Sequence, residues 1–217
     1  MRRGIYKTTK TIIILGRLFG RGGRAVGKKL AEDLGIPYYD KEILQRAAKE
    51  SGICESLFEN HDEKPTSSFL YSLVMDTYSA GYATMGMQEM PMSQKVFLAQ
   101  FDTIKKIAEE GPCVIVGRCA DYALEELDNV VSVFVHAPLE KRAARVAEYE
   151  KIDNVAAKNM ALQNDKKRAS YYNNYSNKMG GDGATYDLCV NTGKVGIYGA
   201  AEIIKNYVIM KESRIEL

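Results

Sequence analysis

The sequence lacks three features that would each point to a specialised class of protein. Its four cysteines form no C-x-x-C pair, so we expect reduced thiols rather than disulfides or a zinc site. No apolar run approaches the ~20 residues that a membrane-spanning helix needs. Thirty basic residues against 28 acidic ones leave a formal charge of +2. A net charge this close to zero does not indicate binding to a nucleic acid or to an anionic membrane.

What the sequence does contain is typical of a globular protein. Hydrophobic residues make up 46% and charged residues 27% of the sequence, as in most globular proteins. A chain of 217 residues is long enough to form one domain with a well-buried core. The N-terminal MRRGIYKTTK is basic, like the start of a signal peptide, but the apolar stretch after it is too short for one. We therefore expect a cytoplasmic protein in which residues 1–217 form a single domain.

The stretch Thr11–Gly35 predicts a strand, a glycine-rich turn and a helix arranged to bind phosphate. Its run of isoleucine and leucine at 12–15 is typical of a buried parallel strand, and apolar residues at helical spacing follow the glycines. A helix that begins at a glycine turn presents unpaired N–H groups and a partial positive charge, to which arginines add full charges. The expected phosphate-binding residues are Gly20, Arg21, Gly22, Gly23, Arg24 and Ala25.

This turn does not carry a complete P-loop motif. The segment Gly22–Lys28 fits G-x-x-x-x-G-K, but it places Lys28 in the second helical turn and Lys29 where a hydroxyl should bind magnesium. In the register directly after the strand, the lysine position is Gly23 and the hydroxyl position is Arg24. At least one expected group is missing in either register, so a plain glycine turn with solvated arginines remains an alternative.

Short apolar strands alternate with helices along the chain, which predicts a doubly wound parallel sheet. Ligands bind such sheets at the carboxyl ends of the strands, where Arg118 follows the strand CVIVG. Asp40 and Arg46 bracket the start of a helix, either as a cap and a surface arginine or as groups that face the ligand. The basic helix before MGGDG is either a lid that closes on phosphates or a solvated helix packed through its tyrosines.

The Met- and Tyr-rich stretch at 70–92 suggests an adaptable surface. Such a surface could close over a substrate, pack against a second subunit or form a loosely specified core. A homodimer is therefore left open.

Taken together, the segments GRLFGRGGRAVGKKLAEDLGIPYYD, VIVGRCADY, VFVHAPLEKR, DKKRASYYNNY and YDLCVNT resemble the nucleoside monophosphate kinases, and within them the cytidylate kinase-like family of bacterial proteins. The resemblance implies a three-layer α/β P-loop kinase fold, with a parallel sheet flanked by helices. The core would comprise 8–50, 95–150 and 186–217, with a helical substrate-binding insertion at about 51–94 and a lid at about 151–185.

The resemblance also implies an activity and roles for particular residues. The activity is phosphoryl transfer from ATP–Mg²⁺ to a nucleoside monophosphate, CMP-like, or to a related small phosphate acceptor. Acceptor-side residues would be Asp40, Arg46 and Arg118, and lid residues Asp165 and Arg168. Arg24, Arg118 and Arg168 would be catalytic, because arginine forks neutralise the charge of a loose transition state. No protein residue is assigned to a metal.

The sequence departs from the family pattern at three places. Cys119 stands where the family has an aspartate after the strand-end arginine, Asn191 stands in for an aspartate in the last strand, and the P-loop lysine is missing. These departures keep two alternatives open. The first is a non-catalytic nucleotide-binding sensor with a degenerate loop, and the second is a small-molecule kinase of the shikimate type.

Overall fold

The computed structural model describes residues 9–62, 90–176 and 178–215. In these residues five strands form one sheet in the order β2-β3-β1-β4-β5, and every neighbouring pair is parallel. This confirms the predicted parallel sheet. The strands are β1 (Ile12–Arg17), β2 (Tyr38–Tyr39), β3 (Val114–Val116), β4 (Val130–His136) and β5 (Leu188–Asn191).

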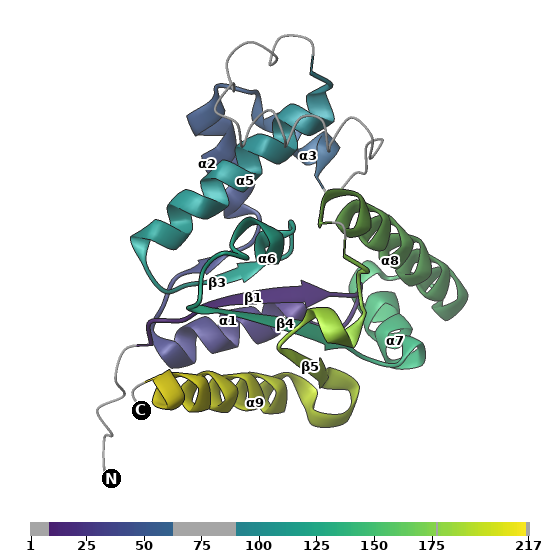
Figure 1. The fold of residues 1–217 in the computed structure, drawn as a ribbon. Coiled ribbons are helices and arrows are strands. Elements are labelled where there is room, and N and C mark those ends of the chain that lie inside the picture. The colour runs from purple at the N-terminus through teal and green to yellow at the C-terminus, as the bar shows by residue number, and fades with distance from the viewer. Residues whose placement is uncertain (1–8, 63–89, 177, 216–217) are drawn as a thin grey trace.

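Helices cover both faces of the sheet, which gives three layers (Figure 1). One face is covered by α1 (Gly23–Leu34) and α9 (Thr192–Ile215), and the other by α5 (Met92–Glu110), α6 (Ala120–Ala123) and α8 (Asn154–Ser176). The described chain also contains α2 (Glu42–Ser51), α3 (Glu55–His61), α7 (Leu139–Glu150) and the short 3-10 helix η1 (Gly183–Thr185).

The central strand β1 explains why its sequence is apolar without interruption. Ile12 and Ile14 pack into the core beneath α5, α6 and α8, whereas Ile13 and Leu15 pack into the core beneath α1 and α9. Successive side chains of a strand point to opposite faces, so a strand covered on both sides needs apolar residues at every position. Packing in both cores fixes the position of β1, and β1 in turn fixes the start of the loop that follows it.

The carboxyl ends of the parallel strands meet at one edge of the sheet (Figure 1). β1 ends there at Arg17 and β3 at Val116, so the glycine turn and Arg118 lie at the same edge. All five strands lie within the ranges expected for the core, and α8 lies within the range expected for the lid. Most of the Met- and Tyr-rich stretch falls in 63–89, outside the described residues. None of the described helices is long and apolar enough to cross a membrane.

The buried β1 side chains should dominate stability. Ile13 is fully buried, so Ile13→Ala removes apolar contacts and leaves a cavity that should cost about 2–5 kcal/mol of unfolding free energy. The same change at Ile203, which is 40% exposed on α9, should cost about 0.5 kcal/mol. Urea denaturation of both variants measures the difference, and equal losses would contradict the assignment of β1 to the centre of the core.

Candidate functional site

The turn between β1 and α1 requires glycine at two positions. Gly20 and Gly22 both have left-handed backbone angles, with φ of 80° and 79°. A Cβ atom on Gly20 would lie 2.6 Å from the Val146 side chain, and one on Gly22 would lie 2.8 Å from Nη1 of Arg145. Gly22 also caps α1 without a side-chain hydrogen bond, so the first turn of the helix offers its N–H groups to a ligand.

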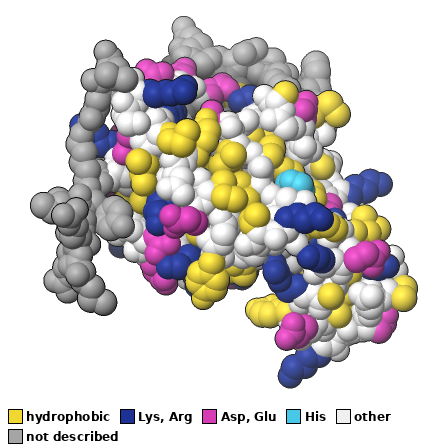
Figure 2. Space-filling model, turned by 90° about the horizontal axis from the view of Figure 1, so that it is seen from below, with side chains coloured by type: hydrophobic (Ala, Val, Ile, Leu, Met, Phe, Trp, Pro, Cys, Tyr) yellow, Lys and Arg dark blue, Asp and Glu magenta, His cyan; other side chains and the backbone are white. Residues whose placement is uncertain are grey.

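A cavity of about 330 Å³ lies against this turn. Its lining includes five arginines: Arg17, Arg21, Arg24, Arg145 and Arg168. Figure 2 shows Lys and Arg side chains gathered where the lobe that contains α7 and α8 joins the rest of the molecule. The turn is therefore not filled by protein atoms, and its surroundings favour a multiply charged anion.

Asp40 gathers arginines from three different segments. Its carboxylate lies 2.5 Å from Nε of Arg24, 3.3 Å from Nη1 of Arg118 and 3.8 Å from Nη2 of Arg17. Asp40 is buried, so these ion pairs are shielded from water on the carboxylate side. The structure thus brings together three of the residues that the sequence singled out, Asp40, Arg24 and Arg118.

Arg118 has a second carboxylate partner, Asp62, which was not predicted from the sequence. Its Nε and Nη2 donate to the two carboxylate oxygens of Asp62, at 3.1 and 2.9 Å, in a bidentate pair. Arg118 and Cys119 both adopt left-handed backbone angles, with φ of 57° and 53°, which non-glycine residues seldom do. Cys119 occupies the position where the family has an aspartate. It is buried, and its thiol is not a carboxylate.

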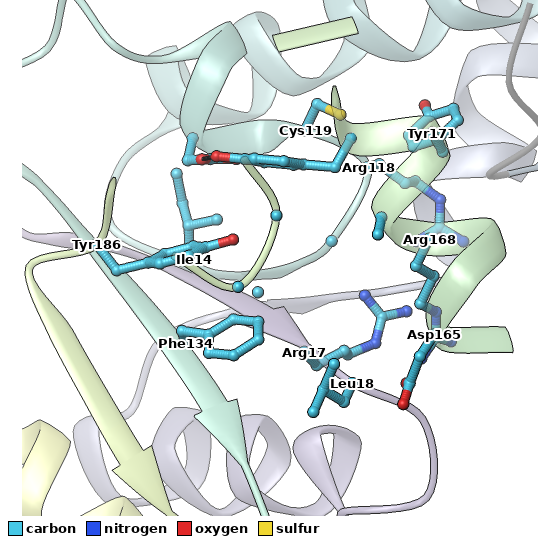
Figure 3. Close-up of a pocket in the computed structure, with 17 residues that line it drawn as sticks. Ile14, Arg17, Leu18, Arg118, Cys119, Phe134, Asp165, Arg168, Tyr171 and Tyr186 are labelled. Carbon is cyan, nitrogen blue, oxygen red and sulfur yellow. Dashed lines mark hydrogen bonds between the residues drawn. The ribbon is translucent and has the colours of Figure 1, made fainter. Parts of the chain in front are cut away.

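The helix α8 holds the glycine turn through Asp165. This carboxylate accepts hydrogen bonds from the backbone N–H of Phe19 and from Nη1 of Arg142, both at 2.6 Å. Arg142 also donates to the carbonyl oxygens of Phe19 and Ala137. The guanidinium of Arg168 lies over the Phe19 ring, 5.5 Å from its centroid. Asp165, which the family pattern predicts to contact nucleotides, is bonded here to the loop backbone, and it also lines the cavity of Figure 3. The part that Arg142 plays in this arrangement was not predicted from the sequence.

Arg46, a predicted acceptor-side residue, is paired with carboxylates of α2 and α5. Its guanidinium donates to Glu50, one turn further along α2, and to both carboxylate oxygens of Glu110 at the end of α5. Hydrogen bonds to Glu110 and Glu50 raise the pKa of Arg46. Lys106 extends this exposed network. Arg46 lines neither the cavity at the turn nor the cavity of Figure 3.

A smaller cavity of about 70 Å³ lies between the sheet and α8 (Figure 3). Arg17, Arg118 and Arg168 contribute to its lining, together with the aromatic rings of Phe134 and Tyr186, which stack 4.9 Å apart. The hydroxyl of Tyr172, also in the lining, donates to Asp121. Burial raises the pKa of Asp121. This cavity therefore joins guanidinium groups to an aromatic and polar wall.

The donor groups fit a phosphorylated ligand better than a resident metal ion. In the described residues no group of three or more His, Cys, Asp and Glu side chains is placed to hold a metal. Asp40 and Asp165, which lie against the turn and its arginines, are already engaged by guanidinium groups. Mg²⁺ is commonly held by one or two carboxylates together with substrate phosphates, so it could enter with a nucleotide.

Comparisons with known proteins show what the chain is similar to. A family model described as the cytidylate kinase-like family matches residues 12–194. A cytidylate kinase from Methanocaldococcus jannaschii is 25% identical and aligns over 91% of this chain and 97% of its own length. One from Methanopyrus kandleri is 26% identical over 84% of this chain and 85% of its own length.

Solved structures show the same arrangement of elements. An uncharacterized protein from Eubacterium ventriosum is 33% identical and superimposes with a TM-score of 0.69, covering 91% of this chain and 98% of that one. Shikimate kinase from Bacteroides thetaiotaomicron covers 91% of this chain and 98% of its own with a TM-score of 0.53, at 14% identity. At that identity the likeness concerns the fold alone.

The bond between Asp165 and the turn can be tested directly. Asp165→Ala removes the acceptor of the Phe19 N–H, and a hydrogen bond to a charged group contributes about 1.5–3 kcal/mol. The Phe19 amide should therefore exchange with solvent deuterium about 10- to 100-fold faster. Asp33→Ala, which removes an exposed partner of Lys29 on α1, is the matched control. Unchanged protection at Phe19 in Asp165→Ala would show that α8 does not hold the turn.

Proposed function

The chain belongs to the cytidylate kinase-like family and has the three-layer P-loop kinase fold, and on that premise we propose that it transfers a phosphoryl group from ATP to a nucleoside monophosphate, CMP-like, or a related small phosphate acceptor. The observation that carries this proposal is the cavity at the glycine turn, whose arginines come from the turn and the ends of β1 and α1 that flank it, from α7 and from α8. Guanidinium groups converging from separate segments suit a polyphosphate.

On the donor side, the turn and α7 would hold the phosphates of ATP. The N–H groups at the start of α1 and the guanidinium of Arg145, which lies against Gly22, line one cavity. Arg145 was not among the residues that the sequence singled out, because an arginine on an ordinary amphipathic helix carries no signal of its position. ATP supplies the transferable phosphoryl group when it is bound.

On the acceptor side, Asp40, Arg118 and Arg168 are the residues best placed to orient a phosphorylated acceptor. Arg118 already binds a carboxylate with its fork, and a phosphate offers the same pair of oxygen acceptors. Cys119 cannot provide the carboxylate that an aspartate would, so the acceptor is proposed as a class of compound rather than as CMP alone. Asp165 would act one step further away, by fixing the turn.

The chemistry asks little of these residues beyond position and charge. The transferred phosphoryl group passes through a loose transition state with negative charge on several oxygens, which guanidinium groups neutralise. No strong general base is required, so the absence of a catalytic histidine does not oppose the proposal. Mg²⁺ would bring further positive charge with the nucleotide.

The alternative is a nucleotide-binding protein that has lost transfer activity. The missing P-loop lysine is the observation behind it, because removing one charge-stabilising group can cost about 10²–10³-fold in rate. The two relatives described above, both named cytidylate kinase, favour the enzyme, since their alignments span 84% and 91% of this chain. Both alternatives require ATP to bind at the turn, and only the enzyme requires the acceptor side.

One assay separates them. The purified protein is mixed with ATP–Mg²⁺ and a panel of nucleoside monophosphates, and ADP release is followed. We expect turnover with at least one acceptor, and a loss of about 10²–10³-fold in Arg118→Ala, because that change removes the acceptor's main cation. Arg118→Lys, which keeps the charge but not the fork, should fall between them. Arg214→Ala, an exposed change near the end of α9, is the control.

The assay has clear contrary outcomes. Tight ATP binding without turnover on any acceptor would favour the sensor. Turnover that is unaffected by Arg118→Ala would mean that the acceptor binds elsewhere. Thermal melting of each variant shows whether a lost activity reflects a lost fold, which matters because Arg118 is buried against Asp40 and Asp62.

A further inference from the structure

Arg21, in the middle of the glycine turn, is buried in a way that arginines seldom are. Its side chain is 1% exposed and is one of the largest fully buried side chains of the described residues. Its Nε donates to the carbonyl oxygen of Leu18 at 2.7 Å. Its Nη1 and Nη2 atoms have no hydrogen-bond partner in the part of the chain that the structure describes. Buried guanidinium nitrogens normally have hydrogen-bond acceptors, and an anion would provide acceptors for these two donors.

The charge around Arg21 is not balanced by the protein. Burial lowers the pKa of Arg21 to about 8, and Asp165 opposes that effect, but Arg142, Arg168 and Arg17 add to it. Asp165 is itself committed to Arg142 and to the Phe19 N–H. The ring of Phe134, 5.3 Å from the guanidinium carbon, offers only a weak cation–π contact. The desolvated charge is therefore largely uncompensated, which destabilises it in the free protein.

The other two arginines of the turn differ in this respect. Arg24 is 55% exposed at its side chain and lies 2.5 Å from Asp40. Arg17 lies against the same carboxylate. Each of them thus lies beside the carboxylate of Asp40, whereas no carboxylate of the described residues forms an ion pair with Arg21. The geometry separates three arginines that the sequence leaves equivalent.

Arg21 also lies between two spaces that are rich in positive charge. It lines the cavity at the turn, and it lines a second cavity of about 250 Å³ that borders the residues directly after β4 and β5. In that second cavity the charged residues among the described lining are all basic: Arg21, Lys141, Arg142 and Arg145. A phosphate chain held at the turn would therefore meet Arg21 from either side.

We propose that Arg21 is the cation that takes the place of the missing P-loop lysine, and that its terminal nitrogens bind a phosphate of the nucleotide held by the turn. This inference rests on the proposed function, because it assumes that ATP binds there. Arginine at this position has a consequence that lysine would not. Its planar fork can bind two phosphate oxygens at once, so it can couple the phosphate to the backbone of the turn through Leu18.

A purely structural role for Arg21 predicts the opposite behaviour. If the side chain served only to bond the Leu18 carbonyl and to pack on the Phe134 ring, its removal would destabilise the free protein and leave nucleotide affinity unchanged. If the side chain binds an anion, its removal takes away an uncompensated buried charge, so the free protein is not destabilised, and the affinity for phosphates falls. The two roles thus move stability and affinity in different directions.

The experiment uses the full chain with Arg21→Met, which keeps length and removes charge, and Arg21→Lys, which keeps charge. Titration calorimetry with ATP and with inorganic tripolyphosphate measures affinity, and thermal melting without ligand measures stability. We expect Arg21→Met to bind both about 10- to 100-fold more weakly, with a melting temperature no lower than that of the unaltered protein. Arg21→Lys should recover part of the affinity. Arg214→Met, an exposed change on α9, is the matched control and should bind as the unaltered protein does.

The outcomes are distinguishable. Unchanged affinity in Arg21→Met, with or without a lower melting temperature, overturns the inference but leaves the proposed function standing. If Arg21→Met does not fold, Arg21→Lys decides: affinity near that of the unaltered protein supports the inference, and affinity weakened 100-fold or more overturns it. If the unaltered protein binds neither ATP nor tripolyphosphate, the proposed function fails, and the inference fails with it.

Discussion

Two carboxylates, Asp40 and Asp165, allow this edge of the sheet to hold so many cations in a fixed arrangement. Guanidinium groups repel one another, and at 4 Å a pair of unit charges interacts by about 4 kcal/mol at the effective dielectric of a protein surface. Asp40 offsets this for Arg17, Arg24 and Arg118, and Asp165 does so for Arg142. The cations are therefore in place before a ligand arrives, which is the condition under which electrostatic stabilisation of a transition state is largest.

The sequence could predict the parts of this arrangement that depend on neighbours along the chain. The β-branched run of β1, the glycines that follow it and the helical spacing of α1 are local signals, and the structure has each element where these predict it. The position of Arg118 beside Asp40 could also be foreseen, since both follow strands that end at one edge of a parallel sheet.

The contacts that the sequence could not predict join residues that are distant along the chain. Phe19 and Asp165 are 146 positions apart, and nothing local distinguishes Asp165 from the other acidic residues of a polar helix. The pairing of Arg46 is of the same kind. The family pattern predicts this residue beside the acceptor, and in the structure its two terminal nitrogens donate to Glu110, 64 positions away. Such pairings are decided by how α2 packs against α5, which depends on the whole fold.

Replacing a lysine by arginines from several elements changes what phosphate binding depends on. A P-loop lysine belongs to the turn and carries its charge on a flexible stem, so it acts almost independently of the rest of the domain. Here Arg145 comes from α7 and Arg168 from α8, and α8 also fixes the turn through Asp165. These two helices pack on each other through Ala143, Val146 and Ala157. In the proposed function, phosphate binding therefore depends on the packing of this helix pair as well as on the turn, because the pair carries two of the cations and anchors the turn.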